Sequence, residues 1–111
     1  MTACYQVATT LDSEVAAGRL AATLVEERLA ACVQVSGPLQ SIYRWEGAVS
    51  TTTEWTCTAK TVETRLPALL ARIRALHPYQ QPEIVATAIS TGDPGYLDWL
   101  RKESTPTPEH R

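Results

Sequence analysis

The spacing of apolar side chains changes several times along the chain, and each change predicts a new element. Four stretches place apolar residues at alternate positions, as half-buried strands do: residues 3–10, 31–45, 48–60 and 84–90. Three others show the three- and four-residue spacing of amphipathic helices: residues 14–29, residues 65–76 and a short run from Tyr96. The order β-α-β-β-α-β plus a short C-terminal helix predicts an α+β fold, a ferredoxin-like two-layer sandwich with two helices on one face of the sheet.

Capping residues and glycines mark the boundaries of these elements. Asp12 or Ser13 offers a side-chain oxygen that can cap the first helix, and Thr64 does the same for the second. Gly37-Pro38 interrupts the second strand and predicts a bulge or bend. Glu46-Gly47 predicts the turn between the second and third strands, which together form a long hairpin.

One face of the third strand predicts contact with another subunit. Three of its residues share one side (Trp55, Cys57 and Ala59), and three share the other (Thr56, Thr58 and Lys60). The second side is small and polar but carries almost no charge, whereas a face in water normally carries more Lys and Glu. The hairpin is also longer than a small domain needs to cover its own core. Both features predict a closed oligomer.

Composition narrows the class of protein. The chain has 111 residues, 44% hydrophobic and 20% charged, which fits one globular domain over residues 1–103 and a flexible C-terminal tail over residues 104–111. The net charge is −2 without a basic face, which disfavours a nucleic-acid partner. No apolar run approaches the ~18 residues of a membrane span. The N-terminus does not resemble a signal peptide, and the three cysteines, read as reduced thiols, indicate a cytoplasmic protein.

The densest candidate chemistry lies at the corner between the second helix and the last strand. Residues 77–84 read His-Pro-Tyr-Gln-Gln-Pro-Glu-Ile and contain an imidazole, a phenol and a carboxylate between two prolines that stiffen the backbone. The simplest structural interpretation of His77 is a helix-end residue that interacts with the negative end of the helix dipole. His110, in the tail, is expected to be exposed.

Five motifs, in order and at matching spacing, resemble the divalent-cation tolerance (CutA) family. They are Arg28-Leu29-Ala30-Ala31-Cys32-Val33, Ser41-Ile42-Tyr43-Arg44-Trp45-Glu46-Gly47, Lys60-Thr61, His77-Pro78-Tyr79-Gln80-Gln81-Pro82-Glu83, and Gly92-Asp93-x-x-Tyr96-Leu97-x-Trp99-Leu100. The resemblance covers about residues 3 to 101. It implies a ferredoxin-like protomer and a PII-like homotrimer in which the long hairpin pairs with neighbouring chains. It also implies binding of copper and other divalent metal ions, and no established reaction.

Within that resemblance, His77 is the leading metal-ligand candidate, because neutral imidazole suits copper and other late first-row ions. Glu83 would add an oxygen ligand and Cys32 a thiolate. Some family members carry a cysteine and a second histidine at the positions of Ala8 and Leu76, so one histidine of that set is present here.

The alternative is a small-molecule site in a cleft between subunits. Aromatic walls, an acid, a base and a fixed cation suit a pocket with a few polar anchors: Tyr43, Trp45, Lys60, His77, Tyr79 and Glu83. Lys60 would meet an anionic ligand. A structural interpretation buries Tyr43 and Trp45 at the trimer contact instead.

The sequence therefore predicts a cytoplasmic, non-enzymatic homotrimer that binds divalent metal ions, copper (Cu²⁺) first, in response to metal stress. The sequence contains neither a Ser-His-Asp order nor a nucleophile elbow, the patterns that would indicate catalysis. Two other hypotheses stay open: a PII-like sensor of a small ligand, and a trimeric scaffold that docks another protein.

Overall fold

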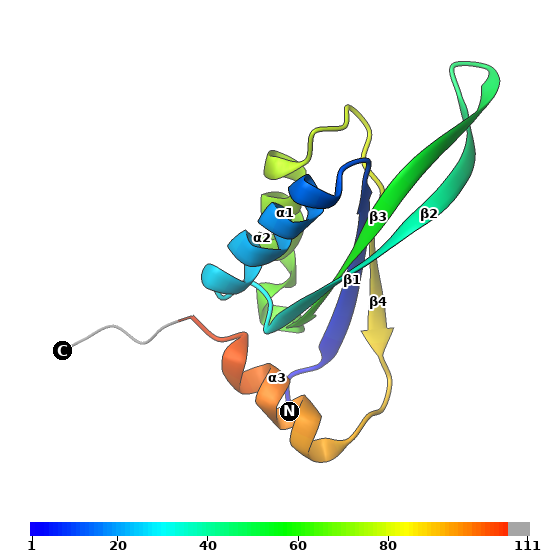
Figure 1. The fold of residues 1–111 in the computed structure, drawn as a ribbon. Helices are drawn as coiled ribbons and strands as arrows, with labels where there is room; N and C mark the ends of the chain where they lie inside the picture. The colour runs from blue at the N-terminus through cyan, green and yellow to red at the C-terminus, as the bar shows by residue number, and fades with distance from the viewer. Residues whose placement is uncertain (107–111) are drawn as a thin grey trace.

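The computed structural model describes residues 1–106 and confirms the predicted fold class (Figure 1). Its elements in chain order are β1 (Cys4–Leu11), α1 (Glu14–Glu26), β2 (Cys32–Trp45), β3 (Ala48–Val62), a 3₁₀ turn (Glu63–Arg65), α2 (Leu66–Leu76), β4 (Ile84–Ile89) and α3 (Pro94–Glu103). The strands form one antiparallel sheet in the order β2-β3-β1-β4. This is the split βαβ arrangement that the element order predicts.

Helices α1 and α2 cover one face of the sheet, and the main core lies between these two layers (Figure 1). Val7 of β1 and Cys57 of β3 point into it and meet Leu24 of α1 and Leu69 and Ile73 of α2, each at most 1% exposed. Because successive strand residues point to opposite faces, the even-numbered residues of β1 and β3 face away from these helices.

Helix α3 covers only one end of that opposite face. Leu100 packs there against Cys4 and Val62 in a small second cluster. Further along the sheet, Val85 of β4 lies beside Ala8 of β1 and is 52% exposed. The small, nearly uncharged face predicted from β3 is therefore present, and its residues Thr56, Thr58 and Lys60 are partly exposed in the single chain. We refer to it as the open face.

Beyond the body of the sheet, β2 and β3 continue as a long projecting hairpin (Figure 1). The predicted turn at Glu46-Gly47 is confirmed, since both residues have positive φ (50° and 81°), as in a two-residue hairpin turn. The predicted interruption at Gly37-Pro38 is also confirmed, as a shift in the pairing of β2 with β3. Gly37 has φ of 149°, and a Cβ there would lie 2.7 Å from the Trp55 ring, so glycine is required.

Some details differ from the sequence prediction. Ser13 caps α1 as expected, but the helix ends at Glu26 because Arg28 adopts a positive φ of 58°. The chain enters α2 through the 3₁₀ turn without a side-chain cap, so Thr64 does not have its predicted role. Val15, an apolar residue in the first turn of α1, is 64% exposed. None of the helices within residues 1–106 is long and apolar enough to cross a membrane.

The described residues continue past residue 103, the predicted end of the domain. Ser104 is fully buried, and the carbonyl of Thr105 accepts a hydrogen bond from Arg28 Nε at 2.6 Å. The rest of the predicted tail, residues 107–111 with His110, lies outside the described residues.

Both ends of the described chain lie at α3. At the N-terminus, Arg101 Nε of α3 donates to the carbonyl of Thr2 at 2.8 Å. These contacts lie at the end of the molecule opposite the hairpin tip (Figure 1).

Candidate ligand-binding site

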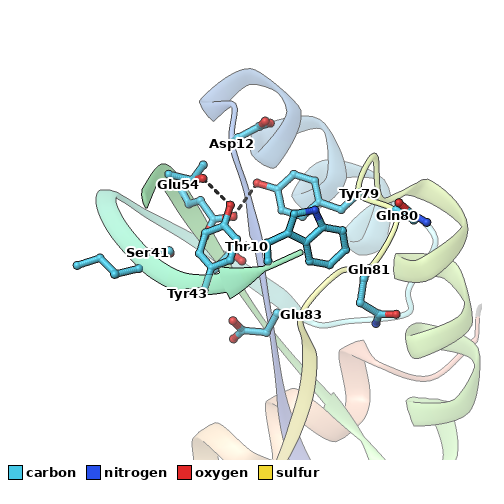
Figure 2. Close-up of a pocket in the computed structure, with 12 residues that line it drawn as sticks. Thr10, Asp12, Ser41, Tyr43, Glu54, Tyr79, Gln80, Gln81 and Glu83 are labelled. Atoms are coloured by element: carbon cyan, nitrogen blue, oxygen red, sulfur yellow. Dashed lines mark hydrogen bonds between the residues drawn. The ribbon is translucent and has the colours of Figure 1, made fainter. Parts of the chain in front are cut away.

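A cavity of about 650 Å³ lies where the hairpin, the end of β1 and the loop after α2 meet (Figure 2). Half of its lining residues come from the hairpin beyond the shift in pairing, and the other half from the other two segments. The lining residues are Thr10, Asp12, Ser41, Ile42, Tyr43, Trp45, Thr52, Glu54, Tyr79, Gln80, Gln81 and Glu83. Because the three segments are distant in sequence, the cavity depends on the complete fold.

The strand register explains why the hairpin side chains converge here. Ser41 lies opposite Thr52, and directly opposed residues of an antiparallel pair share a face. Glu54, Thr56 and Lys60 are separated by even numbers of residues along β3, so all three side chains lie on the same side of the sheet, the open face. The cavity is therefore continuous with the open face, on the side predicted to meet another subunit.

Glu54 is the central polar group of the cavity. It is 5% exposed, and the Tyr79 hydroxyl donates to its Oε2 at 2.6 Å (Figure 2). Its Oε1 has no hydrogen-bond partner within residues 1–106 and is not sealed from solvent. A buried carboxylate is stable only when its charge is compensated. The free oxygen is therefore able to accept a further hydrogen bond.

His77 supports the loop that carries Tyr79. Its Nε2 lies 2.9 Å from the Thr10 carbonyl, and its Nδ1 accepts the backbone N–H of Tyr79 at 3.2 Å. A carbonyl only accepts, so Nε2 carries the proton and the neutral ring satisfies both contacts. Burial lowers the pKa of His77, although the bond to Thr10 and the nearby charges of Glu54 and Asp12 oppose that shift. The ring also packs edge-on against Tyr79, with centroids 4.8 Å apart.

The cavity is negatively charged. Asp12, Glu54 and Glu83 line it, whereas none of its described lining residues is Lys, Arg or His. The pKa of Tyr79 is raised by burial first, then by its hydrogen bond to Glu54 and by the charges of Glu54 and Asp12. Tyr43 is also held in place, since its hydroxyl lies 2.7 Å from Thr52 Oγ1. Two of the aromatic side chains in the wall, Tyr43 and Tyr79, are therefore held by hydrogen bonds in a cavity that three carboxylates line.

Two of the predicted site residues, Lys60 and Cys32, lie away from the cavity in the folded chain. Lys60 pairs with Gln6 and Cys32 across the sheet, four residues along β1 from Thr10, or about 13 Å at the usual strand rise. Its Nζ donates to Gln34 Oε1 at 3.1 Å and lies 5.7 Å from the centre of the Tyr96 ring.

Cys32 is also at that end, with its Sγ 3.7 Å from the Tyr96 hydroxyl. Within one chain, an anion in the cavity would not meet Lys60.

Residues 5–103 match the family model described as CutA1 divalent ion tolerance protein. The chain belongs to that family. The divalent-cation tolerance protein CutA of Thermus thermophilus is 50% identical over 95 residues, covering 86% of this chain and 92% of the relative. The human and mouse CutA proteins are 37% identical, and the chain spans 52% of their length.

Solved CutA structures share the fold. A divalent cation tolerance protein from Thermus thermophilus superposes with a TM-score of 0.87 at 48% identity, covering 90% of this chain and 97% of that one. CutA1 from Oryza sativa gives 0.88 at 39% identity, covering 96% of both chains. A CutA from Archaeoglobus fulgidus, described as a periplasmic protein, gives 0.88 at 31% identity, covering 92% of this chain and 99% of that one.

In this CutA1 chain the structure brings together four of the predicted site residues: Tyr43, Trp45, Tyr79 and Glu83. His77 lies behind them as a support, and Lys60 and Cys32 lie apart. Within residues 1–106, no three His, Cys, Asp or Glu side chains are placed to hold one metal ion.

Sequence reasoning did not identify Glu54 or Asp12. A signal for Glu54 was present, since it is the one charged residue in the otherwise uncharged run 48–59 of β3. A lone charge in such a strand indicates a specific partner. For Asp12 the sequence predicts only a helix-capping role.

Proposed function

We propose that this chain acts in divalent-cation tolerance by binding a ligand in the cavity beneath the hairpin. The single observation that carries the proposal is Glu54, a buried carboxylate with one oxygen free, facing a cavity of about 650 Å³ with aromatic walls. Small-molecule sites have this character, with largely apolar walls and few convergent polar groups.

Thermal denaturation with divalent salts and small metabolites tests this function. A ligand that binds only the folded chain raises its Tm. Tyr43→Ala removes a cavity wall, and Tyr96→Ala is the matched control because the two rings are similarly exposed (41% and 39%) and only Tyr43 lines the cavity. The stabilisation should disappear in Tyr43→Ala and persist in Tyr96→Ala. Equal loss in both variants would show that the ligand binds elsewhere.

The assembly in this proposal is a homotrimer. The sheet order leaves the outer edges of β2 and β4 unpaired in the chain as described, and unpaired strand edges readily pair with another copy. The open face offers apolar surface at Val85, and the hairpin offers Ile42 (69% exposed) and Val49 (63% exposed). Light scattering should give three chain masses, and a stable monomer at micromolar concentration would contradict this assembly.

Copper binding is the second candidate, and its ligands would be His77, Glu83 and Cys32. One chain does not fit this set, since both ring nitrogens of His77 already have partners and Cys32 lies at the other end of β2. Glu83, exposed at the cavity, favours the candidate because its carboxylate faces solvent. A competition titration against a chelator of known affinity decides. Tight copper binding that is lost in His77→Ala supports the site, and weak binding indifferent to that substitution rejects it.

The proposed role is binding rather than catalysis, in the cytoplasm. His77 is committed to structural contacts through both nitrogens, which removes the best acid–base group from reaction chemistry. Cys4, Cys32 and Cys57 are free thiols, as suits a reducing compartment. Fractionation of cells expressing the full chain, probed with an antibody, tests the location.

A further inference from the structure

We propose that the ligand of the cavity is a linear aliphatic polyammonium ion, a cation whose charges are spread along a methylene chain. This inference rests on the proposed role of the cavity as the ligand site and adds the chemical class of the ligand. Three features of the cavity carry it: the sign of its charge, the separation of its carboxylates, and the nature of its walls.

The charge of the cavity favours a cation. Its carboxylates come from three different segments of the chain: Asp12 directly follows β1, Glu54 is on β3, and Glu83 directly precedes β4. Its described lining contains no basic side chain to balance them. The Glu54 carboxylate is 5% exposed and keeps Oε1 free, so an N–H donor of a cation would complete its hydrogen bonding.

The separation of these carboxylates disfavours a single metal ion. Metal ligands must converge to within about 2–2.6 Å of one ion. Asp12 and Glu83 lie at opposite ends of the cavity (Figure 2), and no three-residue metal-binding group exists in residues 1–106. A cation with two or more ammonium groups on a flexible chain satisfies separated carboxylates, because each group meets its own partner.

The walls suit the methylene segments of such a cation. Tyr43 and Trp45 are 41% and 43% exposed, and both line the cavity. Alkyl stems of cationic groups pack along apolar surface, and ammonium groups are attracted to aromatic faces. Gln80 and Gln81, at the rim, offer amide oxygens to further N–H donors (Figure 2).

Calorimetric titration of spermidine into the intact protein at physiological ionic strength tests the proposal. The key variant is Glu54→Gln, which keeps an oxygen that can accept from Tyr79 but removes the charge. We expect saturable binding that weakens about tenfold or more in this variant, as for loss of a charge-assisted hydrogen bond. Glu26→Gln removes the same net charge from the exposed side of α1 and should leave the affinity unchanged.

Several results would overturn the inference. They are absence of saturable spermidine binding, equal weakening in Glu54→Gln and Glu26→Gln, or equally tight binding of the neutral chain 1,8-octanediol as of 1,8-diaminooctane. Magnesium alone, if it binds as tightly and with the same dependence on Glu54, would show that the cavity takes an inorganic cation.

The outcome also separates this inference from the proposed function. If spermidine does not bind, but another compound stabilises the protein and loses its effect in Tyr43→Ala, only the polyammonium assignment fails. If no compound or salt depends on Tyr43, the cavity itself is not the functional site and both proposals fail.

Discussion

Removal of the Tyr79 hydroxyl tests the contact that joins the 79–83 loop to the hairpin. Tyr79→Phe keeps the ring and deletes only the O–H group that donates to Glu54 Oε2 at 2.6 Å. A hydrogen bond to a charged group contributes about 1.5–3 kcal/mol, and Glu54 is too buried for water to replace the lost donor fully. We therefore expect the free energy of unfolding to fall by about 2 kcal/mol, which corresponds to a Tm lower by about 8 °C in a domain of this size.

Urea denaturation at pH 7 and one fixed protein concentration provides the assay, because an oligomer makes stability depend on concentration. A double-mutant cycle of Tyr79→Phe with Glu54→Ala should give a coupling of about 1–2 kcal/mol. Tyr5→Phe is the control, since the Tyr5 hydroxyl makes no hydrogen bond among the described residues.

A cost for Tyr79→Phe no larger than that of Tyr5→Phe, with no coupling to Glu54, would refute this reasoning. The cavity wall would then be held by packing alone, and Glu54 would have no fixed orientation toward a ligand.

Two further predictions concern pH and backbone geometry. The folded-state pKa of His77 is lowered from its usual 6.5, so its contribution to stability is complete above pH 6.5 and is lost as the pH falls through the folded value. His77→Gln should flatten the dependence of Tm on pH between 7.5 and 5, and an unchanged dependence would assign it to other groups. Gly37→Ala should destabilise the fold by about 2 kcal/mol, because its Cβ would lie 2.7 Å from Trp55 at a φ of 149°. Gly18→Ala, in α1 with no atom within 4 Å of the added Cβ, should instead stabilise by about 0.5–1 kcal/mol in the same urea assay, so equal effects would contradict this account of Gly37.

The fold was predictable because its elements have clear local signals. Alternating strands, the Ser13 cap and the Glu46-Gly47 turn each reflect forces between residues close in sequence. Errors arose where a boundary depended on distant contacts. Arg28, for example, ends α1 in a positive-φ conformation while its side chain donates to the carbonyls of Lys102 and Thr105.

The candidate site was predictable only in part, for a related reason. The aromatic residues stood out by type, but their meeting depends on the hairpin register after the shift near Gly37. Lys60 illustrates what residue type alone does not predict. It lies on the same strand as Glu54, but its partner Gln6 is four residues along β1 from Thr10, which lines the cavity. His77 stood out as a ligand by type, whereas the backbone groups that occupy both of its nitrogens are invisible in a sequence.

The location of the two ends of the described residues has a practical consequence. Thr2 and Thr105 are both fastened to the α3 end of the molecule, opposite the hairpin tip. A fluorescent protein or affinity tag fused next to Thr2 or directly after Thr105 would therefore emerge far from the cavity and leave its entrance free. A reporter for ligand binding is better built by attaching a small dye at the Glu46-Gly47 turn, where the chain is exposed on the structure that forms the cavity wall.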